Sequence, residues 1–307
     1  MFYLISLFMG VVISIMVAVN GNLTARYGLH SATIIIHIIG LILIMAIVLI
    51  KRERFFPKRF AWFLYLGGAT GVLTVLFNNV AFGRISVSAI MALGLFGQGV
   101  SGLLIDQYGL FGMKKHPFTK QKIFGFLLIL AGIFYMINTF ETVAVIVSFL
   151  AGVTIVLSRT FNAKLADVTS VRVSTFYNYL VGLTVAVFIF MLLGRAETGH
   201  VLDTLHAEFI AAPRMFAENW HIYLGGVFGV VVVLLSNVVV VKISAIYLTL
   251  LIFAGTIFSG VVIDVMLTGE FSMRNVVGGI LVTAGLCINL LLDKKTFGGV
   301  KNLVDKS

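Results

Sequence analysis

Long apolar runs alternate with short polar connections along almost the entire chain. A helix that crosses a hydrocarbon core about 30 Å thick needs roughly 20 apolar residues, and runs of this kind predict ten membrane spans. The predicted spans cover residues 2–22, 31–50, 61–82, 87–108, 123–140, 143–163, 173–194, 220–241, 245–267 and 275–292. All three prolines fall between these runs, where a missing backbone N–H is tolerated. The pattern therefore predicts an all-α membrane protein with ten transmembrane helices.

The composition supports this prediction. Of the 307 residues, 60% are hydrophobic and 11% are charged, whereas a water-soluble domain is typically about half apolar and about a quarter charged. The single cysteine, Cys287, stands inside an apolar run, which excludes an intramolecular disulfide and a cysteine-based metal site. We expect neither a cofactor nor a metal.

The net charge of +10 is distributed unevenly among the connections. Ten spans place both termini and the even-numbered connections on one side of the membrane, and this side carries 17 of the 22 basic residues. The other five are Arg26, Arg84, Arg195, Arg214 and Arg274. By the positive-inside rule both termini are predicted to be cytoplasmic, so the basicity indicates topology and not a nucleic-acid surface. Arg159, near the cytoplasmic end of the sixth span, is expected to reach the lipid headgroups.

The longest connection, residues 195–219, includes residues 201–210, whose apolar positions recur at helical spacing. This spacing predicts a short interfacial helix on the outer face. Trp62 and Trp220 open their spans, as aromatic residues that anchor a helix at the membrane interface do.

The two halves of the sequence resemble each other. Residues 62–113 match residues 220–271 at a constant offset of 158, and apolar composition alone would not reproduce the shared Trp, Asn, Ser and Asp positions. These pairs include Trp62 with Trp220, Asn79 with Asn237, Gly97 with Gly255, Ser101-Gly102 with Ser259-Gly260, and Asp106 with Asp264. Offsets of 142 and 153 pair Gly10 with Gly152, Asn20 with Asn162, Gly40 with Gly182, Gly125 with Gly278 and Gly132 with Gly285. We predict two five-helix repeats, at residues 1–140 and 141–293, followed by a cytoplasmic tail at residues 294–307.

Because each predicted repeat has an odd number of spans, the second copy enters the membrane inverted. Inverted repeats are the architecture of many secondary transporters, in which exchange of the two halves' conformations alternates access to a midplane site. The repeat therefore favours a secondary transporter, specifically an exporter of small molecules. A channel or passive facilitator for small neutral solutes is the alternative, since some channels also contain inverted repeats.

Several short motifs resemble the drug/metabolite transporter superfamily. In the first half they are Leu64–Gly68, Asn79–Phe82, Ile85–Ala89, Phe118–Gly125 and Ala131-Gly132. In the second half, Gly269–Ser272, Gly278-Gly279 and Ala284-Gly285 are similar to that superfamily's Gly-Glu turn and helix-packing glycines. Asn20–Leu23 and the overall spacing most resemble the YdcZ-like inner-membrane exporters, here as a fused double-length form.

This resemblance implies a ten-helix fold and small-molecule export across a bacterial inner membrane, and it implies no particular substrate. The first half departs from the pattern, because Gly112 stands where the second half has Glu270. The first span also lacks the glutamate with which some relatives handle positively charged compounds, which puts multidrug-cation antiport in doubt.

Polar residues within the spans are candidates for the transport pathway, because an unpaired polar group costs free energy in hydrocarbon. Gln98 lies near the centre of the fourth span and its repeat partner Thr256 near the centre of the ninth. We predict that these residues, together with Ser101 and Ser259, line a central cavity. The competing interpretation is that they bridge helices.

His37 is the only histidine well inside a span, and Tyr179 occupies its repeat position beside Asn178. The histidine could accept a coupling proton, although a buried, hydrogen-bonded histidine is the more common case. Asn79 and Asn237 recur at equivalent depths, where they could contact substrate or tie helices together. 

Asp106 and Asp264 are the only acidic residues embedded in the apolar runs. Each is predicted near the C-terminal end of its helix, where the helix dipole disfavours an anion, so each needs a partner. They are candidates for proton coupling, although anchoring or a salt bridge to Arg84 or Lys242 is the favoured interpretation. Asn20 and Asn162 are predicted to cap the first and sixth helices.

No motif for ATP binding, for zinc hydrolysis or for a catalytic triad occurs, so we predict no enzyme activity. The expected partners are membrane lipids and a small solute of neutral, zwitterionic or lipophilic character. A monomer is compatible with the repeat, since the fused chain supplies both halves.

Overall fold

The computed structural model describes residues 2–55, 61–112, 120–137, 141–211, 213–239 and 245–304. Every regular element among these residues is a helix, so the prediction of an all-α fold is confirmed. The α-helices are α1 (Phe2–Tyr27), α2 (Leu29–Ile50), α3 (Leu66–Ala81), α4 (Val87–Tyr108), α5 (Lys122–Met136), α6 (Thr142–Val168), α7 (Val171–Ile189), α8 (Thr198–His206), α9 (Pro213–Asn219), α10 (Gly225–Val239), α11 (Ala245–Thr268) and α12 (Met273–Val304). Short helical turns are η1 (Trp62–Tyr65), η2 (Leu110–Gly112), η3 (Phe190–Gly194), η4 (Arg195–Glu197), η5 (Ala207–Ala211) and η6 (Trp220–Leu224).

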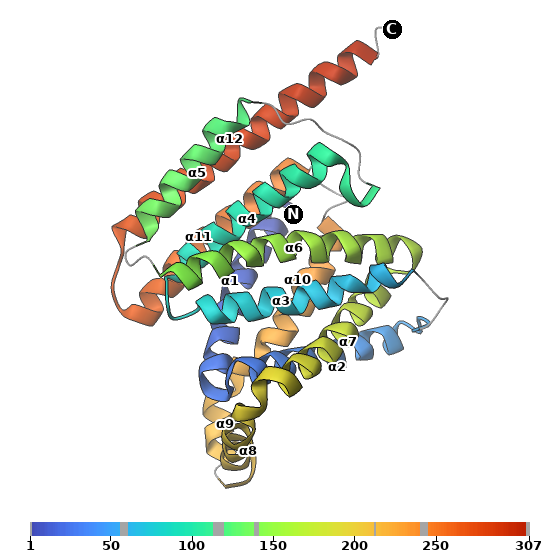
Figure 1. Cartoon of the computed structure of the whole chain (residues 1–307), viewed down its shortest axis with the longest axis vertical. Helices are drawn as coiled ribbons and strands as arrows, with labels where there is room; N and C mark the ends of the chain where they lie inside the picture. The colour runs from blue at the N-terminus through green and yellow to red at the C-terminus, as the bar shows by residue number, and fades with distance from the viewer. Residues whose placement is uncertain are drawn as a thin grey trace.

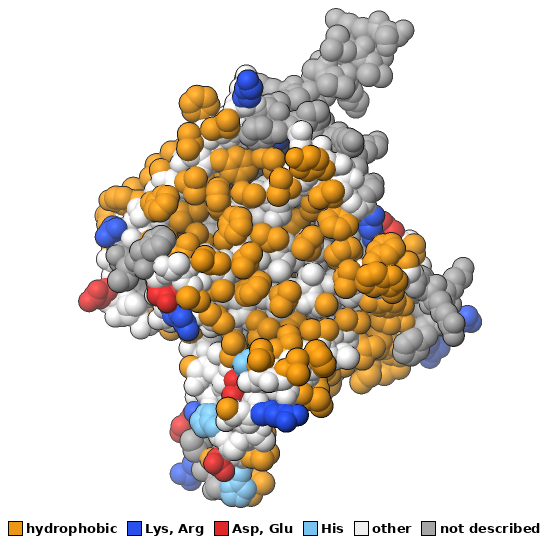
Figure 2. Space-filling model, in the orientation of Figure 1, with side chains coloured by type: hydrophobic (Ala, Val, Ile, Leu, Met, Phe, Trp, Pro, Cys, Tyr) orange, Lys and Arg blue, Asp and Glu red, His pale blue; other side chains and the backbone are white. Residues whose placement is uncertain are grey.

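Eight of the described helical segments are long and apolar enough to cross a membrane. They are Phe2–Tyr27, Leu29–Ile50, Trp62–Ala81, Val87–Ile105, Thr142–Val168, Val171–Ile210, Ala217–Ser236 and Leu250–Thr268. Two shorter apolar helices, Lys122–Met136 and Met273–Asn289, coincide with the other two predicted spans. Hydrophobic side chains cover most of the visible body, and charged side chains gather at its edges and on the extension at the bottom (Figure 2). A multi-pass membrane protein accounts for this surface.

The helices pack in pairs that join the two halves of the chain. α5 lies along α12 at one side of the molecule, whereas α2 lies along α7 at the other (Figure 1). Between them, α1 packs on α11 and α10, and α6 packs on α4 and α3. The core therefore forms from contacts between the halves.

Glycines permit the close approach of these helices. A Cβ on Gly10 in α1 would overlap the backbone of Ile252 and Gly255 in α11. A Cβ on Gly152 in α6 would likewise overlap the backbone of Gly94 in α4. Small residues at such positions let helix backbones approach where lipid provides little hydrophobic driving force.

Glycines also show that the helices of the α2–α7 pair and of the α5–α12 pair run antiparallel. In the α2–α7 pair, Gly40 faces the ring of Tyr179 and Gly182 faces the ring of His37. In the α5–α12 pair, the earlier glycine of α5, Gly125, faces Gly285 of α12, and the later Gly132 faces Gly278. Residues further along one helix thus meet residues earlier in the other.

α1 and α6 are longer than their predicted spans, so Asn20 and Asn162 do not cap them. α1 ends at Tyr27 and α6 at Val168, which leaves both asparagines inside helices. The prediction of caps is wrong because the polar residues after each apolar run continue the helix.

The two asparagines instead pack against glycines of other helices. The amide of Asn20 contacts Gly225 at the start of α10, and the amide of Asn162 contacts Gly67 at the start of α3. Asn162 also donates to the Asn178 amide oxygen at 2.8 Å and to the Ser158 hydroxyl at 3.2 Å. Helix packing is therefore the role that the structure gives them.

Residues 195–219 form an extension from the body, at the bottom of Figure 1, built largely from α8, η5 and α9. The predicted helix in residues 201–210 is confirmed, as α8 followed by the wider turn η5. Trp62 and Trp220 open η1 and η6 and are both exposed. These two tryptophans stand where interface-anchoring residues are expected.

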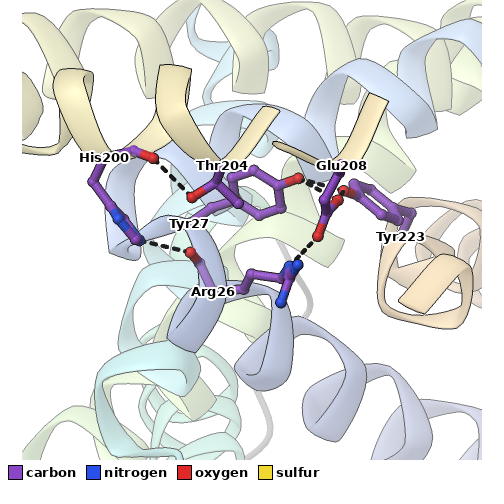
Figure 3. Close-up of polar contacts among 6 residues, drawn as sticks. All are labelled: Arg26, Tyr27, His200, Thr204, Glu208 and Tyr223. Atoms are coloured by element: carbon purple, nitrogen blue, oxygen red, sulfur yellow. Dashed lines mark hydrogen bonds and ion pairs between the residues drawn. The ribbon is translucent and has the colours of Figure 1, made fainter. Parts of the chain in front are cut away.

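A buried carboxylate ties this extension to the end of α1. Glu208 is fully buried and accepts hydrogen bonds from the Arg26 guanidinium and from the hydroxyls of Tyr27, at 2.7 Å, and Tyr223 (Figure 3). His200 Nε2 donates to the carbonyl oxygen of Arg26 at 2.9 Å. The last carbonyls of a helix otherwise lack partners, so the extension also completes the end of α1.

Two further glutamates bind the N-terminal ends of α2 and α7. Glu197 accepts hydrogen bonds from the Ser31 backbone N–H at 3.0 Å and from the His30 ring at 2.8 Å. Glu53, which follows α2, accepts from the Ser170 hydroxyl and pairs with the Arg172 guanidinium. Each carboxylate follows one helix of the α2–α7 pair and binds the start of the other, so both ends of the pair are held.

Candidate substrate pathway

α4 is the most buried of the spanning helices, and its two ends differ. Every residue from 87 to 95 is buried, whereas most residues from Phe96 onward are partly or fully exposed. α1, α6, α11 and α12 all contact this helix. One end of α4 is thus enclosed by protein and the other is accessible.

Asp264 of α11 binds the enclosed end of α4. Its carboxylate accepts hydrogen bonds from the backbone N–H groups of Val87 at 2.6 Å and Ser88 at 3.1 Å, and from the Ser88 hydroxyl. Asn275 of α12 donates to it at 3.2 Å. The unpaired N–H groups and positive dipole end of a helix favour an anion, so α4 supplies the partner that Asp264 needs.

The salt bridges proposed for Asp264 are not present among the described residues. Arg84 pairs with Glu141 at 3.4 Å, and Lys242 lies outside the described residues. The side chain of Asp106, the repeat partner of Asp264, also lies outside them.

Gln98 in the middle of α4 faces Arg159 of α6. The guanidinium donates to Gln98 Oε1 at 3.1 Å. α6 continues to Val168, so Arg159 lies well before the end of the helix. The expectation that Arg159 lies near the end of the sixth helix is therefore wrong, because the helix continues beyond its apolar run. That its side chain reaches the lipid headgroups stays a prediction.

Arg159 has an exposed side chain. Gly102 lies one helical turn beyond Gln98 on the same face of α4, and no described residue comes within 4 Å of a Cβ placed there. Gln98 and Gly102 are both partly exposed. We call the surface formed by Gln98, Gly102 and Arg159 the Gln98–Arg159 surface.

The three hydroxyl residues predicted to line the cavity are occupied within their own helices. Ser101 donates to the Gly97 carbonyl oxygen at 2.8 Å and Thr256 to the Ile252 carbonyl oxygen at 2.6 Å. Ser259 donates to the Gly255 carbonyl oxygen. Their protons are thus already engaged, and Gln98 is the one member of the predicted set whose side chain pairs with another helix.

His37 and Tyr179 lie together between α2 and α7, with ring centroids 5.8 Å apart. His37 is buried, and its Nδ1 lies 2.8 Å from the Thr33 carbonyl oxygen. Tyr179 donates to the Gly226 carbonyl oxygen at 3.4 Å. Asn178 accepts from Asn162 and belongs to the packing network of α3, α6 and α7.

Asn79 is 5% exposed, and neither its amide nitrogen nor its amide oxygen has a hydrogen-bond partner among the described residues. A buried amide of this kind is unusual, so Asn79 stays a candidate for contact with a solute. The side chain of Asn237, its repeat partner, lies outside the described residues.

The sequence does not predict the contact between Arg159 and Gln98, because the end of the apolar run places Arg159 near the end of its helix. One signal was available in the sequence, since Val17 stands at the repeat position of Arg159. A charge that the other repeat does not share is not required by the common helix packing.

No group of three or more His, Cys, Asp or Glu side chains within the described ranges is arranged to hold a metal ion.

Comparison with known proteins identifies the family. A solved crystal structure, described only as that of a protein, shares 15% sequence identity with a TM-score of 0.56, over 96% of this chain and 97% of that one, which supports the fold. No curated protein matches the sequence. The family model described as "Putative inner membrane exporter, YdcZ" matches residues 1–135 and again residues 143–288. The chain therefore belongs to the YdcZ inner membrane exporter family, in a double-length form.

Proposed function

We propose that this protein is a secondary exporter of small molecules that alternates access between two inverted five-helix halves. In this proposal ten helices cross the inner membrane, and both termini are cytoplasmic. The enclosed end of α4, near Val87, then faces outward, and the Gln98–Arg159 surface lies toward the cytoplasm. The positive-inside distribution of the basic residues supports this orientation.

The contacts between the halves support an internal two-fold relation. The Asn20–Gly225 contact becomes the Asn162–Gly67 contact when the repeat offsets are applied. His30 at the start of α2 and Arg172 at the start of α7 also occupy equivalent positions, and each pairs with a glutamate that follows the other helix. The antiparallel packing of α2 on α7 and of α5 on α12 fits a two-fold axis in the membrane plane that relates the two halves.

The difference between the two ends of α4 carries the proposal of alternating access. At the first end, every residue from 87 to 95 is buried, and a Cβ on Gly260 in α11 would lie 3.0 Å from the Ser88 Cα. At the second end, most residues from Phe96 onward are partly or fully exposed. An enclosed outer end and an accessible cytoplasmic end fit the inward-open state of a transporter.

Flux in proteoliposomes tests the proposal. Solute accumulated inside vesicles should exchange with external solute and show saturation, and an imposed gradient should drive counterflow. Flux that rises linearly with the gradient, without saturation or exchange, would support a channel or facilitator and would reject alternating access. 

Accessibility of single cysteines tests the orientation and the state. In a Cys287→Ser background, Gly102→Cys should react with a membrane-impermeant thiol reagent from the cytoplasmic side, because the position belongs to the Gln98–Arg159 surface. Gly199→Cys in the extension, where a Cβ meets no described residue within 4 Å, is the matched control. It should react from the opposite side, and labelling of both positions from the same side would contradict the proposed arrangement.

A further inference from the structure

The guanidinium of Arg159 has one hydrogen-bond partner among the described residues, the Gln98 amide oxygen at 3.1 Å. No carboxylate among these residues lies within ion-pair distance of it. A guanidinium carries five N–H donors, and a charge within a membrane-spanning helix is costly unless it has a partner. One neutral amide satisfies only part of this requirement.

The geometry leaves a second donor next to the guanidinium. A guanidinium only donates, so Gln98 must turn its oxygen toward Arg159. The Nε2 group of the same amide then points elsewhere and can donate to another group. Two kinds of N–H donor, the guanidinium and the amide, are therefore present together at the Gln98–Arg159 surface.

This pair has no counterpart in the other half of the molecule. Val17 and Thr256 occupy the repeat positions of Arg159 and Gln98, and Thr256 instead accepts from the Ser14 hydroxyl through its carbonyl oxygen at 2.6 Å. Helix packing common to both halves thus does not require the charge. α6 carries a second cation, Lys164. Its ammonium group donates to the Phe111 carbonyl oxygen.

We propose that Arg159 and Gln98 bind the carboxylate group of the transported solute. The proposal rests on the exporter function and narrows its substrate to small carboxylates, either monocarboxylic acids or zwitterions such as amino acids. A guanidinium pairs with a carboxylate through parallel N–H···O bonds, and the Gln98 Nε2 group supplies a further donor. One cation matches a single negative charge, which disfavours a phosphate ester.

Binding to the purified full-length protein tests the site directly. Benzoate should raise its thermal stability, whereas benzamide, which has the same shape without the charge, should not. Phenylalanine and phenylalaninamide, which lacks the carboxylate, provide the same comparison for amino acids. We expect Arg159→Gln to weaken the binding of benzoate or phenylalanine by about tenfold or more, and Arg159→Lys to weaken it less.

Lys164→Gln is the matched control, because it removes from the same helix a positive charge that binds Phe111 and not Gln98. It should leave carboxylate binding unchanged. Equal stabilisation by acid and amide, no stabilisation by either acid, or an equal loss in Lys164→Gln and Arg159→Gln would each overturn the proposed site.

Transport separates this proposal from the exporter function on which it rests. Carboxylate-selective binding without saturable exchange would leave the site in place and reject the exporter function. Saturable exchange of neutral solutes that is unaffected by Arg159→Gln would leave the exporter function in place and reject the carboxylate site.

Discussion

Asp264 near the end of α11 binds the first turn of α4 through Ser88, accepting from both its backbone N–H and its hydroxyl. The contact joins α4 and α11 at the enclosed end of α4, which is the closed end in the proposed inward-open state. A carboxylate at a helix N-terminus is a favourable arrangement, and it depends on the distance between α4 and α11. Separation of these helices at this end would break it.

Replacement of this carboxylate should open the closed end. Asp264→Asn keeps one acceptor oxygen but brings an amide N–H group toward backbone donors, so we expect a loss of about 1–3 kcal/mol in the free energy of unfolding. Thermal unfolding measures this loss. Thiol labelling of Ser88→Cys from the outer side should also become faster in the Asp264→Asn variant, and an unchanged labelling rate would contradict a closing role.

The same variant addresses proton coupling, together with Asp106→Asn. If either aspartate carries the proton, its asparagine variant should lose transport driven by a pH gradient and retain solute exchange, since a protonatable carboxylate is the usual coupling group. Efflux measured with and without the gradient distinguishes these results. Unchanged pH dependence in both variants would remove the two carboxylates from the mechanism.

Glu208 should be essential for the attachment of the α8–α9 extension. Removing one partner of a buried ion pair costs about 3–5 kcal/mol, so Glu208→Gln should lower the melting temperature and expose residues 195–219 to protease. Asp203→Asn is the control, because Asp203 is an exposed carboxylate of the same extension. Equal effects of the two variants would show that Glu208 contributes no more than a surface charge.

The Glu53–Arg172 pair should make stability depend on acid pH. Burial raises the pKa of Glu53, but the Ser170 hydroxyl and the Arg172 guanidinium outweigh it and hold the pKa below the ordinary glutamate value. A lowered pKa in the folded state stabilises the protein above the ordinary value of about 4.3, and this contribution is lost as the pH falls through the folded pKa.

Because Arg172 is partly exposed, the contribution should be about 1 kcal/mol or less. Unfolding of the wild type and of Glu53→Gln, measured between neutral and acid pH, should therefore converge as the pH falls. A constant difference between them across this range would contradict the lowered pKa.

The contact of Asn20 with Gly225 predicts a steric conflict with a specific rescue. Gly225→Ala places a methyl group against the Asn20 amide, and overpacking of this kind costs about 1–3 kcal/mol. The Asn20 amide oxygen has no hydrogen-bond partner among the described residues, so Asn20→Ala should cost little and should restore the stability of Gly225→Ala. Additive losses in the double variant, measured by thermal unfolding, would show that the two residues do not meet.

The sequence by itself determined the helical membrane fold, the double-length organisation and the family. Apolar runs are local features, and a hydrophobic length has the same consequence in any bilayer protein. The matching of Trp, Asn, Ser and Asp between the halves is also visible without coordinates. Of the ten predicted spans, length and apolarity in the structure support eight directly, and the other two coincide with the shorter apolar helices α5 and α12.

Only the tertiary structure decided which polar side chains meet. The partners of Asp264 and Arg159 come from other helices, far apart in the sequence, and depend on how each helix is rotated and on how closely glycines let it approach. Helix ends were a second uncertainty, because α1 and α6 continue past their apolar runs. That extension changed Asn20 and Asn162 from expected caps into packing residues, and it placed Arg159 well before the end of α6, beside Gln98. Hydropathy depends only on the order of residues along the chain, whereas these contacts depend on how helices distant in the sequence pack together.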